Sequence, residues 1–374
     1  MDNMNQPIRI AQMMTEMNYG GVEMVVMNYY RHINHSKVQF DFFVLEGSII
    51  PQREEIESLG GRIYVVPHYK KLLSYEKAVI ALLKENKYKI VHSHMNSLSV
   101  FSLRAAKKAG VPIRIAHNHS TSGKGEYKKN ILKYALRPFA KVYPNHLAAC
   151  SHLAGDWLYG KNANYIVFNN AIDLDKYSYN ENMRNILRKE LRLENRLTIG
   201  HIGRFCYQKN HEYLIEIFKC IKQINKDAVL LLIGDGENFD KIKLQIKQLD
   251  LDKSVILMGS INEAYKYYNA MDAFVLPSRY EGLPVVGVEA QASDLQCFFS
   301  DEITSEAKIL DKTTYLSLSK SPNEWAETIC DKCKYVERND NSSIMSEAGF
   351  NIKLASKNLE DYYYELLEKE GGIL

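Results

Sequence analysis

The chain has 374 residues, of which 46% are hydrophobic and 25% charged, and its formal net charge is +3. This composition is typical of a soluble globular protein, and the length predicts two domains with room for sizeable cores. The charge is too small to indicate nucleic-acid binding, and no apolar run approaches the roughly 18 residues of a membrane-spanning helix. Residues 1–7 lack the basic and apolar regions of a signal peptide, so we expect a cytoplasmic protein.

Short apolar segments alternate along the chain with segments of helical periodicity. The first strand is expected at residues 8–14, and Val22, Val25, Val26 and Tyr29 then recur at helical spacing. Such alternation predicts a parallel sheet with helices on both faces. Further strands of the first half are expected at 40–45, 63–66, 90–94, 113–117, 147–150 and 165–168, with helices such as 75–85 and 98–109 between them.

The alternation breaks at residues 169–193, a polar and highly charged stretch, and a second series follows it. We expect an α/β fold with two doubly wound, Rossmann-like domains facing a ligand cleft. The first domain is predicted at 1–180, with a C-terminal helix at 356–374 as a candidate to complete it, and the second at 181–355. Its strands are expected at 198–202, 228–233, 255–258, 273–277 and 297–300, and residues 344–370 are expected to form one or two helices.

Two carboxylates follow the strand expected at 273–277. Glu281 falls in the loop after that strand, Pro284 suits the first turn of a helix, and Glu289 lies further along that helix. Carboxylates at this loop would repel a phosphate but accept hydrogen bonds from sugar hydroxyls. A ligand with hydroxyls at both ends and phosphate in the middle is a nucleotide sugar.

The segment Gly203-Arg204-Phe205-Cys206-Tyr207-Gln208-Lys209 follows the first strand of the second half. Arg204 offers a planar fork to phosphate oxygens and Lys209 a mobile charge, so the pair matches a departing diphosphate. A solvated basic turn is the alternative.

Glycines mark the other turns after strands. Gly20-Gly21 stands where a helix N-terminus could bind phosphate, although the G-x-G-x-x-G spacing of nicotinamide-binding proteins is absent. Gly234 and Gly236, and the turn Gly259-Ser260-Ile261, could present backbone groups to a nucleobase. Each of these segments could equally be an ordinary turn.

Two histidine clusters end strands of the first half, His92-Ser93-His94 and His117-Asn118-His119. We expect these side chains to line the cleft rather than to bind metal, because no carboxylate or cysteine spacing supports a metal site. The aspartate pairs 173/175 and 250/252 are placed in a linker and at a helix end, so we expect no metal cofactor. Cys330 and Cys333 are read as ordinary helical cysteines.

Residues 124–143 combine Lys124, Lys128, Lys129, Lys133, Arg137 and Lys141 with an apolar set that includes Ile131, Leu132 and Phe139. A basic amphipathic helix can lie on an anionic membrane surface. A surface helix packed on its own sheet is the alternative.

Together these residues resemble the retaining glycosyltransferases of family four, which have the GT-B fold, and in particular those that build bacterial exopolysaccharides and capsules. The pair Glu281 and Glu289, with seven residues between them, is the most specific match, and the resemblance covers nearly the whole chain. It implies metal-independent transfer of a sugar from a nucleotide-diphosphate donor, with UDP as the expected carrier, to a glycan acceptor that is expected to be lipid-linked.

The resemblance also implies roles for single residues. Glu289 would hold the ribose, Glu281 and His119 would lie beside the transferred sugar, and Arg204 and Lys209 would bind the diphosphate. The implied catalytic set is His119, Arg204, Lys209 and Glu281, and the implied donor-binding set is Gly20, Gly21, Gly203, Arg204, Lys209, Gly234, Gly236, Ser260, Ile261, Glu281, Gly282, Leu283, Pro284 and Glu289.

One departure from the family pattern follows the acidic motif. The family usually reads Ala-x-Gly-x-Pro there, whereas this chain has Asp294 in place of the glycine and Gln296 in place of the proline. We expect Asp294 to adopt the left-handed conformation that ends a helix. Two alternative functions stay open: a nucleotide-sugar epimerase on the same fold, and a non-catalytic nucleotide-sugar-binding protein.

Overall fold

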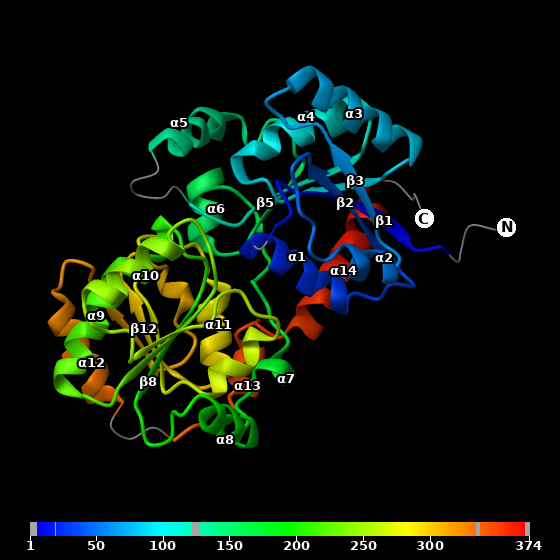
Figure 1. Cartoon of the computed structure of the whole chain (residues 1–374). Coiled ribbons are helices and arrows are strands. Elements are labelled where there is room, and N and C mark those ends of the chain that lie inside the picture. Colours follow the sequence, from blue (N-terminus) through cyan, green and yellow to red (C-terminus); the bar gives the residue numbers. More distant parts are fainter. Residues whose placement is uncertain (1–5, 19, 122–126, 334–336, 371–374) are drawn as a thin grey trace. The chain divides into compact units, whose positions relative to one another are not determined.

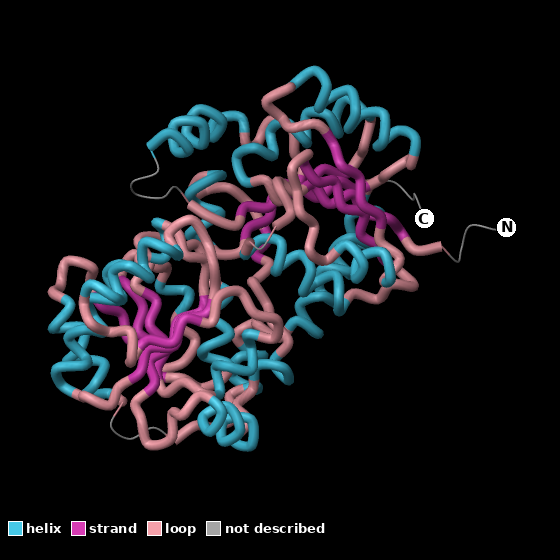
Figure 2. The backbone as a smooth tube through the Cα atoms, in the orientation of Figure 1, coloured by secondary structure: helices cyan, strands magenta, loops and turns pink. Residues whose placement is uncertain are grey.

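The computed structural model describes residues 6–18, 20–121, 127–333 and 337–370. The chain divides by packing into two compact units, Met1–Ala171 with Ile352–Leu374, and Ile172–Asn351. Each unit contains one parallel sheet with helices around it (Figures 1 and 2). The expected α/β class with two doubly wound parallel-sheet units is confirmed.

The first unit has a seven-stranded sheet with the order β3-β2-β1-β4-β5-β6-β7. β1 pairs with both β2 and β4, so the winding of the chain reverses between β1 and β4. Ligands of doubly wound sheets bind outside the carboxyl ends of the strands at such a point. The strands are β1 Ile8–Met13, β2 Val38–Leu45, β3 Arg62–Val66, β4 Ile90–Ser93, β5 Ile113–Asn118, β6 His146–Ala149 and β7 Ile166–Val167.

Local sequence signals account for several helix ends in the first unit. α4 ends at Gly110, whose φ of +81° is the left-handed conformation that glycine adopts without strain. α6 begins after Ser151, whose hydroxyl accepts a hydrogen bond from the backbone N–H of Ala154. The helices are α1 Gly21–His32, α2 Arg53–Ser58, α3 Leu72–Glu85, η1 Asn96–Leu98, α4 Ser99–Ala109, α5 Tyr127–Leu136, η2 Arg137–Phe139, α6 His152–Tyr159 and α14 Ile352–Lys369.

The second unit repeats this plan with a six-stranded sheet in the order β10-β9-β8-β11-β12-β13. β8 pairs with β9 and β11, which places its switch point between β8 and β11. The strands are β8 Thr198–Ile202, β9 Val229–Ile233, β10 Val255–Leu257, β11 Ala273–Leu276, β12 Gln296–Ser300 and β13 Thr313–Leu316. The helices are α7 Leu174–Tyr177, α8 Glu181–Glu190, η3 Tyr207–Lys209, α9 His211–Ile224, α10 Phe239–Gln248, η4 Ala264–Asn269, α11 Val285–Ala292, η5 Ser305–Ala307, α12 Pro322–Lys332 and α13 Ser342–Glu347.

The structure differs from expectation mainly around the polar stretch 169–193. This stretch contains α7 and α8, and α7 packs on α11 within the second unit. We expected the boundary after residue 180, whereas the division by packing falls after Ala171. The C-terminal helix of the first unit begins at Ile352 rather than at residue 356, and β13 has no counterpart among the expected strands.

Cys330 and Cys333 pack against the core of the second unit, which includes the fully buried Trp325. Burial raises the pKa of the Cys333 thiol to about 12, so its thiolate is disfavoured at neutral pH. This environment agrees with the structural interpretation of both cysteines. Within the described part of the chain, no helix has the length and apolar character to cross a membrane.

Candidate active site

Glu281 lies in the loop after β11 and makes an ion pair with Lys209 from η3. The Lys209 Nζ atom is 2.7 Å from Glu281 Oε1, and both side chains are largely buried. The hydroxyl of Ser278 donates to the same oxygen at 3.0 Å, and Gln208 Nε2 donates to Oε2 at 2.9 Å. The structure thus brings together two predicted residues from loops on either side of the β8/β11 switch point.

Glu289 is buried on α11, and Tyr268 donates a hydrogen bond to its Oε2 at 2.7 Å. Burial raises the pKa of this carboxyl above its usual range, although the hydrogen bonds from Tyr268 and Tyr177 oppose the shift. The carboxyl is therefore held by phenols and retains the capacity to accept further hydrogen bonds.

Arg204 and Lys209 differ in environment although both follow β8. The Arg204 guanidinium is 64% exposed and pairs with Glu237, with 2.8 Å between Nη2 and Oε2. Lys209 is buried against Glu281, so of these two cations only Arg204 lies exposed on a loop.

The predicted glycines of the second unit lie where the backbones of three loops, those after β8, β9 and β10, pack closely together. A Cβ atom at Gly234 (φ +136°) would overlap the carbonyl oxygen of Gly203, and one at Gly236 (φ +155°) would crowd the carbonyl of Phe205. Gly234 N–H also donates to the carbonyl of Gly259 at 2.8 Å. Close packing between the loops after β8, β9 and β10 therefore requires these glycines, whether or not a ligand binds.

The remaining predicted donor residues lie at the ends of β10 and β11. Ser260 is exposed and Ile261 half-buried after β10, whereas the loop that leads into α11 is buried. The residues of that loop are Gly282, Leu283 and Pro284, of which Pro284 caps α11.

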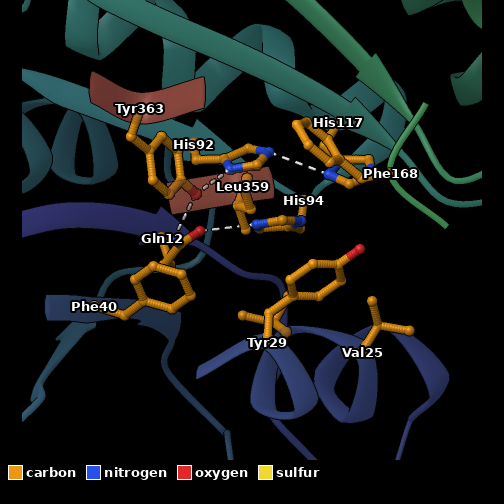
Figure 3. Close-up of a pocket in the computed structure, with 11 residues that line it drawn as sticks. Gln12, Val25, Tyr29, Phe40, His92, His94, His117, Phe168, Leu359 and Tyr363 are labelled. Atoms are coloured by element: carbon orange, nitrogen blue, oxygen red, sulfur yellow. Dashed lines mark hydrogen bonds between the residues drawn. The ribbon is translucent and has the colours of Figure 1, made fainter. Parts of the chain in front are cut away.

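In the first unit, four histidines at the ends of β4 and β5 form one buried cluster, and Figure 3 shows His92, His94 and His117 among them. The ring nitrogens of His92 and His117 are 3.1 Å apart, and those of His94 and His119 are 2.8 Å apart. The two histidine segments, which are separate in the sequence, thus form a single cluster of side chains beside the β1/β4 switch point. A cavity of about 10 Å³, roughly the space of one water molecule, adjoins three of these histidines.

The cluster is also the place where a metal ion could be considered. Among the described residues, His92, His94 and His117 offer ring nitrogens within 4.8 Å of one another. Both nitrogens of His92 and of His94 already take part in hydrogen bonds within the protein. A metal ion would have to displace these bonds.

Gly20 and Gly21 begin α1, with Gly20 in the capping position. A Cβ atom at Gly21 would meet nothing within 4 Å, so the backbone there is open to a ligand. At Gly20 a Cβ atom would overlap the carboxylate of Glu23, which lies in the first turn of the helix. A negative charge is favourable at this position because of the helix dipole.

Asp294 has the left-handed conformation expected of it, with φ +53°. Its carboxylate also binds Lys312 Nζ, the backbone N–H of Asn339 and the side-chain amide of Asn341, at 2.6–2.7 Å. These contacts tie the end of α11 to the segment that leads into α13. Glycine has no side chain with which to make them.

Some residues of these sites carry no signal in the sequence. Gln12 and Tyr363 contact the histidine cluster, and Gln208 and Tyr268 contact the two glutamates. Gln12 stands out only as a polar residue within an apolar strand. Tyr363 is one of three adjacent tyrosines on a helix far away in sequence, so nothing distinguishes it.

Two parallel α/β units with an acidic pair, cations and glycine turns at the strand ends define a GT-B glycosyltransferase. Residues 19–176 match the model of "Glycosyltransferase Family 4", and residues 182–341 that of "Glycosyl transferases group 1". The chain belongs to this family.

Individual relatives agree with this assignment. EpsF of Bacillus subtilis (strain 168), itself a candidate glycosyltransferase, is 36% identical over 86% of each chain. An Escherichia coli UDP-Gal:α-D-GlcNAc-diphosphoundecaprenol α-1,3-galactosyltransferase is 32% identical over 66% of this chain and 65% of its own. The crystal structure of Anabaena Alr3699/HepE in complex with UDP superimposes with a TM-score of 0.77 at 15% identity, over 96% of this chain and 100% of that one, and so supports the fold.

Proposed function

We propose that this protein is a retaining, metal-independent glycosyltransferase that moves a sugar from a UDP-sugar to a lipid-linked glycan during exopolysaccharide or capsule synthesis. The observation that carries the proposal is the placement of Glu281, Glu289 and Lys209 at the β8/β11 switch point. The E. coli relative, whose name specifies a UDP-Gal donor and a diphosphoundecaprenol-linked acceptor, supports the choice of substrates.

In this proposal Glu289 accepts hydrogen bonds from the ribose and Glu281 from the transferred sugar, beside which His119 also lies. Arg204, Lys209 and the amides of Gly20 and Gly21 bind the diphosphate. The backbone groups of Ser260 and Ile261 contact the base.

The proposed chemistry requires no nucleophilic side chain. The bond between the anomeric carbon and the diphosphate oxygen breaks, and the acceptor oxygen bonds to the same face of the sugar. The acceptor proton passes to the departing diphosphate. Arg204 and Lys209 stabilise the charge that develops on this leaving group. Glu281 is held by three donors, which suits a residue that positions hydroxyls rather than one that attacks carbon.

We also propose that α5 and the residues after it contact the cytoplasmic face of an anionic membrane. Ile131 is 70% exposed, Phe139 52% and Val142 51%, and Lys141 is exposed beside them. Exposed apolar side chains next to positive charge are typical of an interfacial helix. Lys124 lies outside the described residues, as do the side chains of Lys128 and Lys129. Lys133 and Arg137 also have contacts within the protein, to the carbonyl of Thr121 and the ring of Trp157.

A screen of UDP-sugars, with and without a diphosphoundecaprenol-linked acceptor, tests the proposed function. We expect acceptor-dependent release of UDP and a product that keeps the anomeric configuration of the donor, determined by NMR. Conversion of the donor sugar without acceptor would instead indicate an epimerase. Tight donor binding without turnover across the acceptor panel would indicate a non-catalytic protein.

A further inference from the structure

The histidine cluster of the first unit belongs to a longer chain of hydrogen bonds that passes through Gln12 (Figure 3). Gln12 lies on β1, and its Nε2 donates to the hydroxyl of Tyr363, on α14, at 3.3 Å. Its Oε1 is 2.8 Å from His94 Nε2. One amide thus contacts two branches of the network, one through Tyr363 and one through His94.

All four histidines of the network are buried, and burial lowers each pKa, that of His119 to about 3. The rings are therefore neutral at pH 7. A neutral imidazole has one N–H donor and one nitrogen acceptor, so fixing the role of one nitrogen fixes the other.

The first branch follows from Tyr363. Its oxygen accepts from the Gln12 amide, and among the described residues His92 Nδ1, at 2.7 Å, is the partner that remains for its O–H, which therefore donates to it. His92 must then carry its proton on Nε2 and donate to His117 Nδ1 at 3.1 Å. His117 in turn carries its proton on Nε2, which is buried and has no hydrogen-bond partner. This branch ends in an unused donor.

In the second branch the hydrogen bonds are donated toward Gln12 rather than away from it. The Gln12 carbonyl oxygen accepts from His94 Nε2–H, which makes His94 Nδ1 an acceptor. His119 Nε2–H donates to that atom at 2.8 Å. The Nδ1 of His119 is then an acceptor, and it too is buried without a partner. This branch ends in an unused acceptor.

His117 Nε2 ends its branch as a donor and His119 Nδ1 ends its branch as an acceptor, and the Gln12 amide explains this difference. One branch begins at the donor of the Gln12 amide and the other at its acceptor. If the amide were turned round, Tyr363 would donate to Gln12 and every proton in the network would move to the other nitrogen of its ring. His117 would then end in an acceptor and His119 in a donor, so the complementarity of the ends would persist.

We propose that Gln12 and Tyr363 are positioning residues that together hold His92, His94, His117 and His119 in one shared tautomer, so that the adjacent rings of His117 and His119 present one donor and one acceptor. These two rings stack with their centroids 4.1 Å apart. A hydroxyl group both accepts and donates, whereas a phosphate oxygen anion needs donors only. The pair therefore matches a sugar hydroxyl, and this part of the inference rests on the proposed function.

NMR of protein labelled with ¹⁵N-histidine tests the shared tautomer, with signals assigned from single histidine substitutions. In the wild type we expect all four residues to be neutral at pH 7 and to carry the proton on the same nitrogen, Nε2 in the arrangement described here. A wild type in which the branches carry different tautomers, or in which one ring is an imidazolium, would overturn the proposal. So would a spectrum that changes on addition of a chelator or of one equivalent of zinc.

Two substitutions should each remove the tautomer preference of the histidines in one branch only. Tyr363→Phe removes the donor to His92, so His92 and His117 should become mixtures of tautomers while His94 and His119 keep theirs. In Gln12→Leu, His94 and His119 should become mixtures of tautomers, while the hydrogen bond from Tyr363 still fixes the tautomer of His92. Tyr29→Phe is the matched control, because the Tyr29 hydroxyl donates to the carbonyl of Asn169 and not to the network. A loss of all four tautomers in every variant would point to general unfolding and contradict the two-branch assignment.

Donor binding separates this inference from the proposed function. We expect Gln12→Leu to weaken binding of the UDP-sugar roughly tenfold, the cost of one mismatched hydrogen bond, while the Kd of UDP alone stays unchanged. Equal affinity of wild type and variant for the UDP-sugar would contradict the hydroxyl-binding role even if the tautomers behave as expected. A wild type that binds no nucleotide sugar would refute the proposed function and leave the tautomer result standing.

Discussion

Lys209 and Glu281 form an ion pair, with 2.7 Å between Lys209 Nζ and Glu281 Oε1. They come from different loops, one after β8 and one after β11, so the ion pair joins the two sides of the switch point. A diphosphate that binds near Lys209 must share this ammonium with Glu281. The structure thus couples the phosphate-binding and sugar-binding parts of the proposed site through a single contact.

We expect Lys209→Met to lower both stability and turnover. The substitution leaves Glu281 buried without its counter-charge, at a cost of about 3 kcal/mol, the lower end for a broken buried pair because Ser278 and Gln208 remain. The double variant Lys209→Met/Glu281→Gln should recover most of the stability but none of the turnover. Urea denaturation and sugar-transfer assays measure both effects. Single and double variants of equal stability would contradict this explanation.

Arg204→Ala should lower turnover by about 10²-fold, because the leaving diphosphate loses a positive charge. Its effect on stability should be below about 1 kcal/mol, since the pair with Glu237 is exposed. Lys71→Ala is the matched control: Lys71 forms a similar exposed pair with Glu46, also at 2.8 Å, and is assigned no role in the site. An Arg204→Ala enzyme that transfers sugar at the parent rate with saturating donor would exclude Arg204 from diphosphate stabilisation.

Glu289→Gln should weaken donor binding by about 1.5–3 kcal/mol, because a charge-assisted hydrogen bond to ribose is lost. Its effect on stability should depend on pH. Burial raises the pKa of Glu289, so below the unfolded value both states are protonated and no penalty exists. As pH rises through the raised folded pKa, the wild type must ionise a buried carboxyl, whereas the variant need not.

The stability of Glu289→Gln relative to the wild type should therefore increase from pH 4 to pH 8. Parallel urea titrations at several pH values measure this difference, and calorimetry with the donor measures the binding. A constant difference in unfolding free energy would show that burial does not disfavour the charge, and an unchanged Kd would exclude the ribose assignment.

Replacing Ile131 and Phe139 by Gln should reduce co-sedimentation with anionic vesicles and slow transfer to a lipid-linked acceptor. Both side chains are more than half exposed, so stability should change little. Leu73→Gln is the control, because Leu73 is 83% exposed on α3, outside this segment. Reversal of Lys128, Lys129 and Lys133 to Glu should abolish binding at low salt. A wild type that fails to bind such vesicles at low salt would exclude the membrane contact.

We expect turnover to persist in a chelator. Both ring nitrogens of His92 and of His94, two of the three histidines that approach a metal-binding arrangement, are already hydrogen-bonded within the protein. Assays in EDTA, with and without added manganese, measure the requirement. Activity that disappears in EDTA and returns with manganese would contradict the proposal.

The sequence predicted the parts of the structure that depend on local pattern. Buried parallel strands such as β9, Val229–Ile233, are continuous apolar runs, and glycine or proline marks their ends, so most strands were placed within a few residues. β13 was missed because its residues, Thr313-Thr314-Tyr315-Leu316, are not strongly apolar. Helices α7 and α8 were missed because a polar sequence resembles a linker, although their few apolar residues pack on the second unit.

Within the candidate site, residue types were predictable and their partners were not. The environments of Arg204 and Lys209 differ because Lys209 alone reaches Glu281, a contact between residues far apart in sequence. The link from His92 to Tyr363 spans most of the chain, from β4 to α14. Such contacts are decided by the topology of the sheets, which no local pattern encodes.

The placement of α14 has a consequence for synthesis of the protein. The helix packs on α1 and carries Tyr363 to the buried histidines, yet the ribosome makes it after the entire second unit. The first unit emerges first but must wait for α14 before its core is complete, whereas the second unit is continuous in sequence and can fold at once. The later-synthesised unit is therefore expected to become resistant to protease first on the ribosome, reversing the usual N-terminal-first order.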